Sequence, residues 1–249
     1  KRQVMKKSRK FGLIGKNIDY SFSKKYFSEK FKKENLDCTY SNFDIENISL
    51  IESILQKNGI SGYNVTIPYK QEIIKFLDEI DEVAKAIGAV NTIKKIDNKN
   101  IGFNTDCIGF EKSLIPLIEN KKPDSALILG GGGASKAVKY VLKKIKINYS
   151  TVSRKEGKSE FIYENLNDVI INRFKMIINC SPVGTFPNIN KCPNIPYKHL
   201  TKEHVLYDLV YNPIESLFLR RGRELGCKTK NGLEMLEIQA NESWRIWNI

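Results

Sequence analysis

The chain alternates short apolar runs with longer segments in which apolar residues recur every three or four positions. Short runs rich in β-branched and aromatic residues predict strands, and the longer periodic segments predict helices. In the first hundred residues the predicted strands are Phe11–Gly15, Thr39–Ile45, Ile60–Thr66, Val90–Ile96 and Asn100–Phe103. The predicted helices there are Lys24–Glu34, Ile48–Gln56, one that begins at Ile67-Pro68, and Asp81–Ile87, which Gly88 ends. The last two strands flank Asp97-Asn98 and predict a hairpin.

The same rhythm restarts after a helix predicted at Asp106–Glu119. The predicted strands of this second series are 125–130, 147–152, 174–180, 204–210 and 228–230. Helices are predicted at 134–144, 214–225 and 232–247, with a mixed segment at 158–171 and a proline-rich loop from Pro182 to Pro196. Strands that alternate with helices predict mainly parallel sheets. We therefore expect an α/β protein with two α/β domains, divided near Thr105–Cys107.

A glycine cluster marks the start of the second series. Leu127-Ile128-Leu129 predicts a buried strand, Gly130, Gly131, Gly132 and Gly133 follow it, and a helix is predicted from Ala134. Glycines let the backbone approach a pyrophosphate, and the helix N-terminus offers N–H groups and a positive dipole end to that anion. The spacing Gly130-x-Gly132 fits a dinucleotide-binding turn, although Ser135 stands where a third glycine is usual.

The end of the next strand bears on the choice of dinucleotide. An NAD enzyme usually places an acidic residue there for the ribose 2′-hydroxyl. This chain has Ser153, Arg154 and Lys155, whose cations pair well with a 2′-phosphate. An ordinary solvated turn is the alternative. With the glycines upstream, the residues favour NADP over NAD.

Two polar stretches of the first series could carry chemistry. Asn64 and Thr66 point the same way in a strand, and Pro68 is expected to start a helix with Lys70 in its first turn, where a cation opposes the helix dipole. Such a local misfit favours a functional lysine over an exposed helical one. Asp106, just before a helix, is either a cap or a carboxylate at the domain junction. Lys70 and Asp106 are candidates for the pair that moves a proton during a hydride transfer.

Two serines and two histidines are further polar candidates. Ser21 and Ser23 lie in a predicted loop, and two hydroxyls there could bind a carboxylate without adding charge; a plain loop is the alternative. His199 and His204 flank a strand start and are interpreted as structural.

Composition narrows the class of protein. The net charge of +13 comes from lysines spread along the chain, which favours a solvated surface, or attraction of small anions, over a nucleic-acid binder. Five scattered cysteines without a Cys-x-x-Cys pair predict neither a disulfide frame nor a metal site and suit a reducing cytoplasm. We see neither a membrane-spanning run nor a secretory signal. The basic segment Lys1–Lys10 is expected to be frayed, with Met5 a candidate natural start.

Taken together, these stretches resemble the shikimate dehydrogenase family over nearly the whole chain. The matching segments, highly specific in this order, are Gly15–Ser23, Asn64–Lys70, Gly88–Thr92, Gly102–Gly109, Leu129–Ala137, Asn179–Gly184, Tyr207–Pro213 and Asn231–Gln239. The resemblance implies a reversible NADPH-dependent reduction of 3-dehydroshikimate to shikimate, on the route to chorismate and the aromatic amino acids. It also implies a substrate-binding domain, residues 1–106 completed by the returning helix 233–249, and a Rossmann-like NADP-binding domain, residues 107–232.

The resemblance assigns roles to individual residues. Lys70 is the implied catalytic acid/base and Asp106 its partner, and Ser21 and Ser23 are expected to hold the substrate carboxylate. Residues implied to contact the rest of the substrate are Thr66, Asn91, Asp106, Gln239 and Tyr211. Residues implied to bind the cofactor are Gly130, Gly131, Gly132, Gly133 and Ala134 at the pyrophosphate, Ser153, Arg154 and Lys155 at the 2′-phosphate, and Leu209 and Gly232 at the nicotinamide.

The sequence departs from the family pattern in two places, and other readings remain. Tyr20 and Lys24 replace a usual His and Pro around the two serines, and Ser-Arg-Lys replaces a common Asn-Arg-Thr.

The alternatives are an NAD-preferring quinate/shikimate dehydrogenase and a catalytically inactive, ligand-sensing relative. The expected partners are small molecules, without nucleic acid or membrane, in a monomer or a homodimer.

Overall fold

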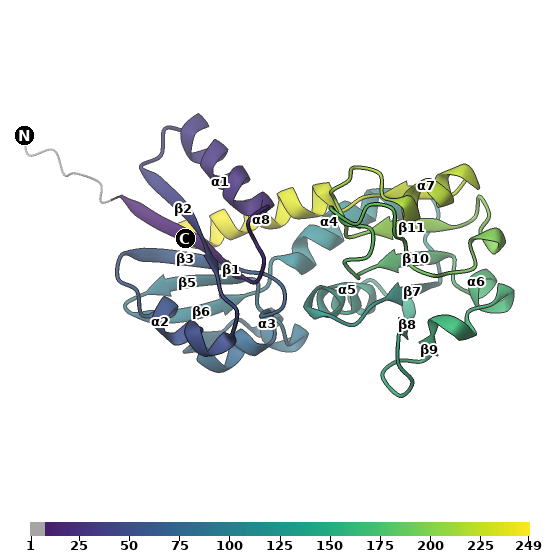
Figure 1. The fold of residues 1–249 in the computed structure, drawn as a ribbon, viewed down its shortest axis with the longest axis horizontal. Coiled ribbons are helices and arrows are strands. Elements are labelled where there is room, and N and C mark those ends of the chain that lie inside the picture. Colours follow the sequence, from purple (N-terminus) through teal and green to yellow (C-terminus); the bar gives the residue numbers. More distant parts are fainter. Residues whose placement is uncertain (1–7) are drawn as a thin grey trace, which may run out of the picture. The chain divides into compact units, whose positions relative to one another are not determined.

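A computed structural model of the protein describes residues 8–249 and divides the chain into two compact units (Figure 1). The first unit contains the residues up to Thr105 together with Ala240–Ile249, and the second contains Asp106–Gln239. The question of Met5 falls on residues outside the described part. The long helices of the described residues include none apolar enough to cross a membrane. Which unit binds substrate and which binds cofactor stays a prediction at this point.

The first unit is built around one mixed sheet of six strands in the order β2-β1-β3-β5-β6-β4. Its strands are β1 (Arg9–Gly15), β2 (Cys38–Asp44), β3 (Ile60–Val65), β4 (Glu79–Ile80), β5 (Thr92–Ile96) and β6 (Lys99–Phe103). Its helices are α1 (Phe22–Lys33), α2 (Ile51–Leu55), α3 (Glu82–Ile87) and the short 3₁₀ turns Ile48–Leu50 and Glu72–Phe76. The predicted hairpin β5–β6 is confirmed: Asp97 and Asn98 take left-handed φ angles of 48° and 65°, which reverse the chain within two residues.

One predicted helix of this unit is wrong. No helix begins at Pro68; residues 67–71 form a turn, the Ile67–Pro68 peptide is cis, and 3₁₀ structure starts only at Glu72. Tertiary contacts override the helix-start signal. The Ile67 carbonyl accepts the Lys16 N–H at 3.2 Å, and the buried Tyr69 hydroxyl donates to the Ile45 carbonyl at 2.6 Å. The argument that a helix dipole opposes Lys70 therefore fails.

The start of the chain also differs from the prediction. Arg9 and Lys10 were expected to fray but belong to β1. The Arg9 guanidinium donates to the Trp247 carbonyl at 2.6 Å and to Asn248 Oδ1 at 2.7 Å, so it caps the C-terminus of α8 (Leu233–Asn248). It also lies over the rings of Phe11 and Trp244, 4.9 and 5.7 Å from their centroids. These contacts and the stacked rings of Phe11 and Trp247 hold the end of α8 in the first unit.

The second unit has one fully parallel sheet of six strands, in the order β12-β11-β10-β7-β8-β9. Its strands are β7 (Ser125–Leu129), β8 (Asn148–Ser153), β9 (Phe161–Ile162), β10 (Met176–Asn179), β11 (Val205–Asp208) and β12 (Lys228–Lys230). Its helices are α4 (Asp106–Ile118), α5 (Gly133–Lys144), α6 (Asp168–Arg173), α7 (Leu217–Glu224) and the first turns of α8, with 3₁₀ turns at Tyr163–Asn165 and Tyr197–His199. In chain order the strands read 6-5-4-1-2-3, the order of the doubly wound dinucleotide-binding fold.

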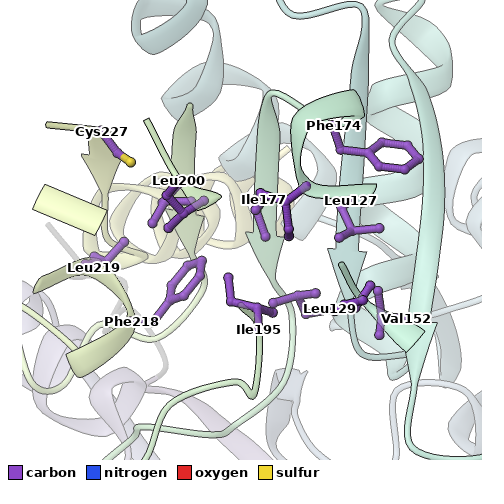
Figure 2. Close-up of a cluster of buried hydrophobic side chains, with 13 residues drawn as sticks. Leu127, Leu129, Val152, Phe174, Ile177, Ile195, Leu200, Phe218, Leu219 and Cys227 are labelled. Atoms are coloured by element: carbon purple, nitrogen blue, oxygen red, sulfur yellow. The ribbon is translucent and has the colours of Figure 1, made fainter. Parts of the chain in front are cut away.

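The core of the second unit lies where the sequence places its apolar strands. Leu127, Leu129 and Ile177 on the central strands pack with Phe174, Phe218 and their neighbours (Figure 2). The three strand residues are completely buried, as expected for parallel strands covered on both faces. The segment 182–196 is irregular, as its prolines predict.

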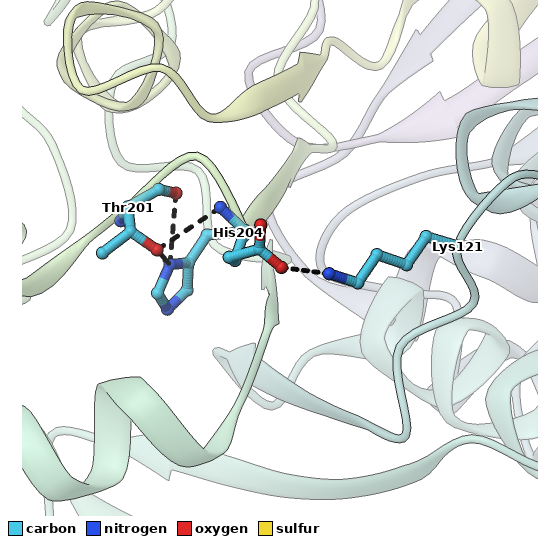
Figure 3. Close-up of polar contacts among 4 residues, drawn as sticks. Lys121, Thr201 and His204 are labelled. Carbon is cyan, nitrogen blue, oxygen red and sulfur yellow. Dashed lines mark hydrogen bonds and ion pairs between the residues drawn. The ribbon is translucent and has the colours of Figure 1, made fainter.

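His204 is a structural residue, as the sequence suggested. Its imidazole is fully buried, and its Nδ1 accepts the Thr201 N–H at 3.0 Å (Figure 3). Its Nε2 lies 3.0 Å from the Ile171 carbonyl. Nε2 is therefore the protonated nitrogen of a neutral ring. Burial lowers the pKa of His204, which keeps the ring neutral at physiological pH.

We predict that Arg9→Ala lowers the free energy of unfolding by about 1–3 kcal/mol, because charged hydrogen bonds and a cation–π contact to α8 are lost together. Urea unfolding followed by circular dichroism measures this effect. The control is Lys10→Ala, which removes an exposed cation from the same strand. Equal stability of the two variants would contradict the capping role of Arg9.

Candidate active site

The predicted pyrophosphate loop lies at the carboxyl edge of the parallel sheet. Gly130 takes a left-handed φ of 104°, and a Cβ there would lie 3.2 Å from the Ser181 backbone nitrogen, so the position favours glycine. At Gly131 and Gly132 an added Cβ would meet no described atom within 4 Å, so this stretch of backbone is open to a ligand. The loop therefore has room for a bulky anion at the switch point between β7 and β10.

The first turn of α5 suits that anion. The helix N-cap is Gly132, which has no side chain to accept the first N–H groups, and residues 133–136 contain no acid. The hydroxyl of Ser135 donates to the Gly132 carbonyl at 2.7 Å, inside the turn. Uncapped N–H groups and the positive end of the helix dipole favour a phosphate. The backbone N–H groups of this turn, rather than its side chains, are what fits a pyrophosphate.

The predicted 2′-phosphate residues lie beside the glycine loop. β7 and β8 pair in parallel with Leu129 opposite Val152, so Gly130 and Ser153 leave neighbouring strands at the same level. The Ser153 hydroxyl donates to the Lys155 carbonyl at 2.6 Å, so Ser153 shapes the turn that presents Arg154 and Lys155. Both cations are exposed at this edge. These two cations suit the 2′-phosphate of NADP. The ribose 2′-hydroxyl of NAD would call for a carboxylate at this place instead.

The predicted nicotinamide residues, Leu209 and Gly232, meet at the ends of β11 and β12. A Cβ on Gly232 would lie 2.2 Å from the Leu209 carbonyl oxygen, and the Gly232 N–H donates to the Val210 carbonyl at 3.0 Å. Only glycine allows so close an approach of two backbones.

Asp208, which is not among the predicted site residues, stabilises the ends of β10 and β11. Its buried carboxylate accepts from Asn179 Nδ2 at 2.9 Å, from the Val210 N–H at 3.0 Å and from the Ser216 hydroxyl. Burial raises the pKa of Asp208 to about 6, and the three hydrogen bonds to its carboxylate oppose that rise. The signal in the sequence was an acid inside an apolar strand. Ser216 also caps α7, which explains why that helix begins at Leu217 rather than at Ile214.

The predicted substrate residues of the first unit gather at one edge of its sheet. The parallel strands β1 and β3 end there, and β5 begins there with Thr92 opposite Asn64. This arrangement places the turn that carries Thr66 and Lys70 beside Asn91.

Backbone hydrogen bonds hold that turn on both sides. The Thr66 N–H donates to the Ile14 carbonyl at 2.9 Å, and the Lys70 carbonyl accepts the Val90 N–H at 2.7 Å. The turn thus lies between β1 and the strand start that carries Asn91. Lys70 itself is half-buried.

Asn91 has a fixed orientation. Its Oδ1 accepts the Thr105 N–H at 2.7 Å, and its Nδ2 donates to the Thr105 hydroxyl at 3.0 Å. The side chain is 2% exposed, so these contacts set which end of the amide is a donor.

The two serines lie at the start of α1. Ser21 is the N-cap by position, yet within residues 8–249 its hydroxyl makes no capping bond to the helix. Ser23 was expected in a loop, but it lies in the first turn of α1, because the helix begins two residues earlier than its apolar periodicity indicates. The N-terminus of a helix suits a carboxylate.

Three predicted residues belong to the second unit. Asp106 begins α4 and is 5% exposed, where the helix N-terminus favours a carboxylate. Gln239 is buried on α8, and its Nε2 donates to the Leu236 carbonyl at 2.9 Å. Tyr211 is half-buried in the segment after β11. The pairing of Lys70 with Asp106 stays a prediction.

We predict that Gly232→Ala weakens NADP binding at least tenfold, because its methyl group forces apart the Leu209 and Gly232 backbones. Fluorescence titration of NADPH measures the dissociation constant. The control is Gly59→Ala in the first unit, where the added carbon meets no described atom within 4 Å and no cofactor contact is assigned. If Gly232→Ala binds NADPH as tightly as the wild type, the close approach has no role in the cofactor site.

Comparisons with known proteins identify relatives of this chain. The family model for the shikimate dehydrogenase substrate binding domain matches residues 13–93. A shikimate dehydrogenase (NADP(+)) from Methanococcus aeolicus is 38% identical over 260 residues, which cover 98% of this chain and 93% of that protein.

Solved structures share the fold. A shikimate dehydrogenase in complex with NADP+ has a TM-score of 0.84 and 34% identity, over 97% of this chain and 90% of that one. A quinate dehydrogenase from Corynebacterium glutamicum in complex with NAD has the same TM-score of 0.84 at 26% identity, over 96% and 93% of the two chains. Because the Methanococcus relative exceeds a third identity over nearly the full length, the protein belongs to the shikimate dehydrogenase family.

Proposed function

We propose that this protein catalyses the reversible NADPH-dependent reduction of 3-dehydroshikimate to shikimate, in the biosynthesis of chorismate and the aromatic amino acids. The observation that carries the proposal is the convergence of Thr66, Lys70 and Asn91 at one edge of the first sheet. The names of the relatives point to the same reaction. The first unit then binds the substrate and the second binds the cofactor.

The substrate is a carboxylic acid with several hydroxyls, and we assign its contacts accordingly. Ser21 and Ser23 hold the carboxylate at the start of α1. In support, the hydroxyl of the N-cap residue Ser21 makes no capping bond to that helix within the described residues. Thr66, Asn91, Asp106 and Gln239 hold the hydroxyls, with Tyr211 close by. Hydroxyl and amide groups suit such a substrate because each can donate or accept.

Lys70 acts as the general acid and base in this proposal. In the reduction its ammonium gives a proton to the oxygen of the substrate ketone, and in the oxidation its amine takes the proton from the hydroxyl. NADPH, when bound, supplies the hydride. Asp106 is the carboxylate partner that keeps Lys70 oriented in this proposal.

We assign the cofactor as NADP rather than NAD. Residues 130–134 bind the pyrophosphate, Ser153, Arg154 and Lys155 bind the 2′-phosphate, and Leu209 and Gly232 contact the nicotinamide. The alternative, an NAD-preferring quinate/shikimate dehydrogenase, has a solved representative with the same fold. The two exposed cations at the end of β8 favour binding of a 2′-phosphate, which argues against the NAD-preferring alternative.

We infer that the enzyme works in the cytoplasm on small molecules, as a monomer or a homodimer and without nucleic acid or membrane. Its five cysteines are free thiols, which suits a reducing compartment. Its cations are dispersed along the sequence rather than clustered with stacking aromatics.

Reduction of NADP+ by shikimate, followed at 340 nm, tests the proposed reaction directly. The assay is repeated with quinate and with NAD+. The proposal predicts that the pair of shikimate and NADP+ has the highest kcat/KM of the four. Efficient quinate oxidation with NAD+ would replace it with the alternative, and failure of all four pairs would indicate an inactive relative.

We predict that Lys70→Ala lowers kcat about 10²–10⁴-fold, the usual contribution of a positioned acid or base. NADPH binding is unchanged, because Lys70 is assigned to the substrate unit. Lys75→Ala, an exposed lysine one turn further along the same segment, is the control and keeps full activity. Activity of Lys70→Ala within tenfold of the wild type would contradict an acid/base role.

We predict that Arg154→Ala lowers kcat/KM for NADPH about 10–100-fold and leaves the value for NADH nearly unchanged, because one charge-assisted contact to the 2′-phosphate is lost. The ratio of the two values is the readout. Arg173→Ala, an exposed arginine just before the amino end of β10, controls for loss of a cation. An equal loss with both cofactors would place Arg154 away from the 2′-phosphate.

A further inference from the structure

The last residue pair of the β10–β11 ladder carries two buried polar side chains. Asn179 and Asp208 are register partners, and each is the last residue of its strand. Both residues are completely buried, and Asn179 Nδ2 donates to Asp208 Oδ1 at 2.9 Å. Side chains therefore bond the two strand ends to each other just before the chain continues into the proposed cofactor residues.

Asp208 also bonds to its own backbone. Its Oδ1 accepts the N–H of Val210, two residues further on, at 3.0 Å, so the side chain closes an Asx turn around Leu209. The Leu209 N–H donates to the Asn179 carbonyl at 3.0 Å. Hydrogen bonds therefore hold the peptide groups on both sides of Leu209, which leaves its backbone little freedom.

This turn sets the direction of the Leu209 carbonyl. The Leu209–Val210 peptide is trans and planar, so its C=O and its N–H point in opposite directions. Because the N–H points to Asp208, the carbonyl points away from Asp208, toward Gly232. The Gly232 N–H in turn donates to the Val210 carbonyl at 3.0 Å. Asp208 thereby fixes the backbone contact between the two residues that the proposed function assigns to the nicotinamide.

Three donors hold the Asp208 carboxylate itself. Oδ1 accepts from Asn179 Nδ2 and from the Val210 N–H, and Oδ2 accepts the proton of the Ser216 hydroxyl. The Ser216 oxygen also accepts the Leu219 N–H, at 3.3 Å, in the first turn of α7. Groups from three segments of the chain therefore fix the orientation of the carboxylate.

We propose that Asp208 is a positioning residue for the cofactor, which acts through the Leu209–Val210 peptide to hold the nicotinamide half of NADPH. The adenosine half, assigned to the end of β8 and to the glycine loop, does not depend on it. This inference rests on the proposed function, which assigns Leu209 and Gly232 to the nicotinamide.

The test is Asp208→Ala, with two ligands titrated separately: NADPH, and adenosine 2′,5′-bisphosphate, which has the 2′-phosphate but no nicotinamide. We expect the dissociation constant of NADPH to rise about tenfold, the equivalent of one charge-assisted hydrogen bond, and that of the bisphosphate to stay within about twofold. Asn179 keeps its bonds to Ser181, whose backbone nitrogen lies next to Gly130, so the glycine loop is undisturbed. Equal losses for both ligands, or no loss for either, would overturn the proposal.

Tyr207→Phe is the matched control for loss of a buried hydrogen bond on β11. The Tyr207 hydroxyl lies 2.6 Å from that of Ser113, and neighbouring residues of a strand point to opposite faces of the sheet. The variant loses a buried contact, as Asp208→Ala does, but binds both ligands like the wild type. A tenfold loss of NADPH binding in Tyr207→Phe would overturn the proposal.

Asp208→Asn separates the turn from the charge. The new amide keeps an oxygen for Asn179 and Val210, and its nitrogen can donate to the Ser216 oxygen. We therefore expect NADPH to bind within about threefold of the wild type. A loss as large as in Asp208→Ala would contradict an action through the turn.

If Asp208→Ala does not fold, Ser216→Ala decides. It removes the donor to Oδ2 and loosens the carboxylate, so NADPH binding is expected to weaken about threefold while bisphosphate binding is unchanged. NADPH binding equal to that of the wild type would overturn the proposal.

The outcomes for the two proposals are distinguishable. A wild-type protein that does not bind NADPH rejects the cofactor assignment and the positioning role together. A wild-type enzyme that uses NADPH, together with an Asp208→Ala variant that binds it as tightly, rejects only the positioning role.

Discussion

The turn from Thr66 to Lys70 is the constraint on which the first unit depends. The Thr66 N–H donates to β1, the Lys70 carbonyl accepts from Val90, and the buried Tyr69 hydroxyl donates to the Ile45 carbonyl. A short, non-helical segment is thereby held from three directions, at a net contribution of about 1 kcal/mol for each hydrogen bond. Side chains on such a backbone lose little further entropy when they bind a ligand, which is what a catalytic site requires.

In the proposed function, the two units bind their anions through different groups. The second unit combines an uncapped helix N-terminus and an open glycine backbone with the cations Arg154 and Lys155. The first unit has the hydroxyls of Ser21 and Ser23 at the start of α1 instead. Cations suit a doubly charged phosphate, whereas neutral hydroxyls suit a single carboxylate that must also be released.

The sequence predicts what is local and misses what is tertiary. The glycine turn after Leu129, the hairpin at Asp97-Asn98 and the left-handed Gly88 that ends α3 follow from residue types at adjacent positions. The helix expected at Pro68 fails because distant strands bind that segment, which propensity does not register. Buried Asn64 accepts a hydrogen bond from Tyr40, 24 residues away, and donates one to Ser243, 179 residues away, so no local motif predicts these contacts. The sequence signal for the contact to Ser243 is a polar residue on the inward face of an amphipathic helix.

A crystal structure with NADP+ and shikimate bound tests the account most directly. The account predicts the 2′-phosphate within hydrogen-bond distance of Arg154, the pyrophosphate on the N–H groups of residues 131–134, and the shikimate carboxylate between the hydroxyls of Ser21 and Ser23. It also predicts the ammonium of Lys70 within reach of the substrate hydroxyl that is oxidised. A carboxylate bound away from both serines, or a hydroxyl that Lys70 does not reach, would contradict it.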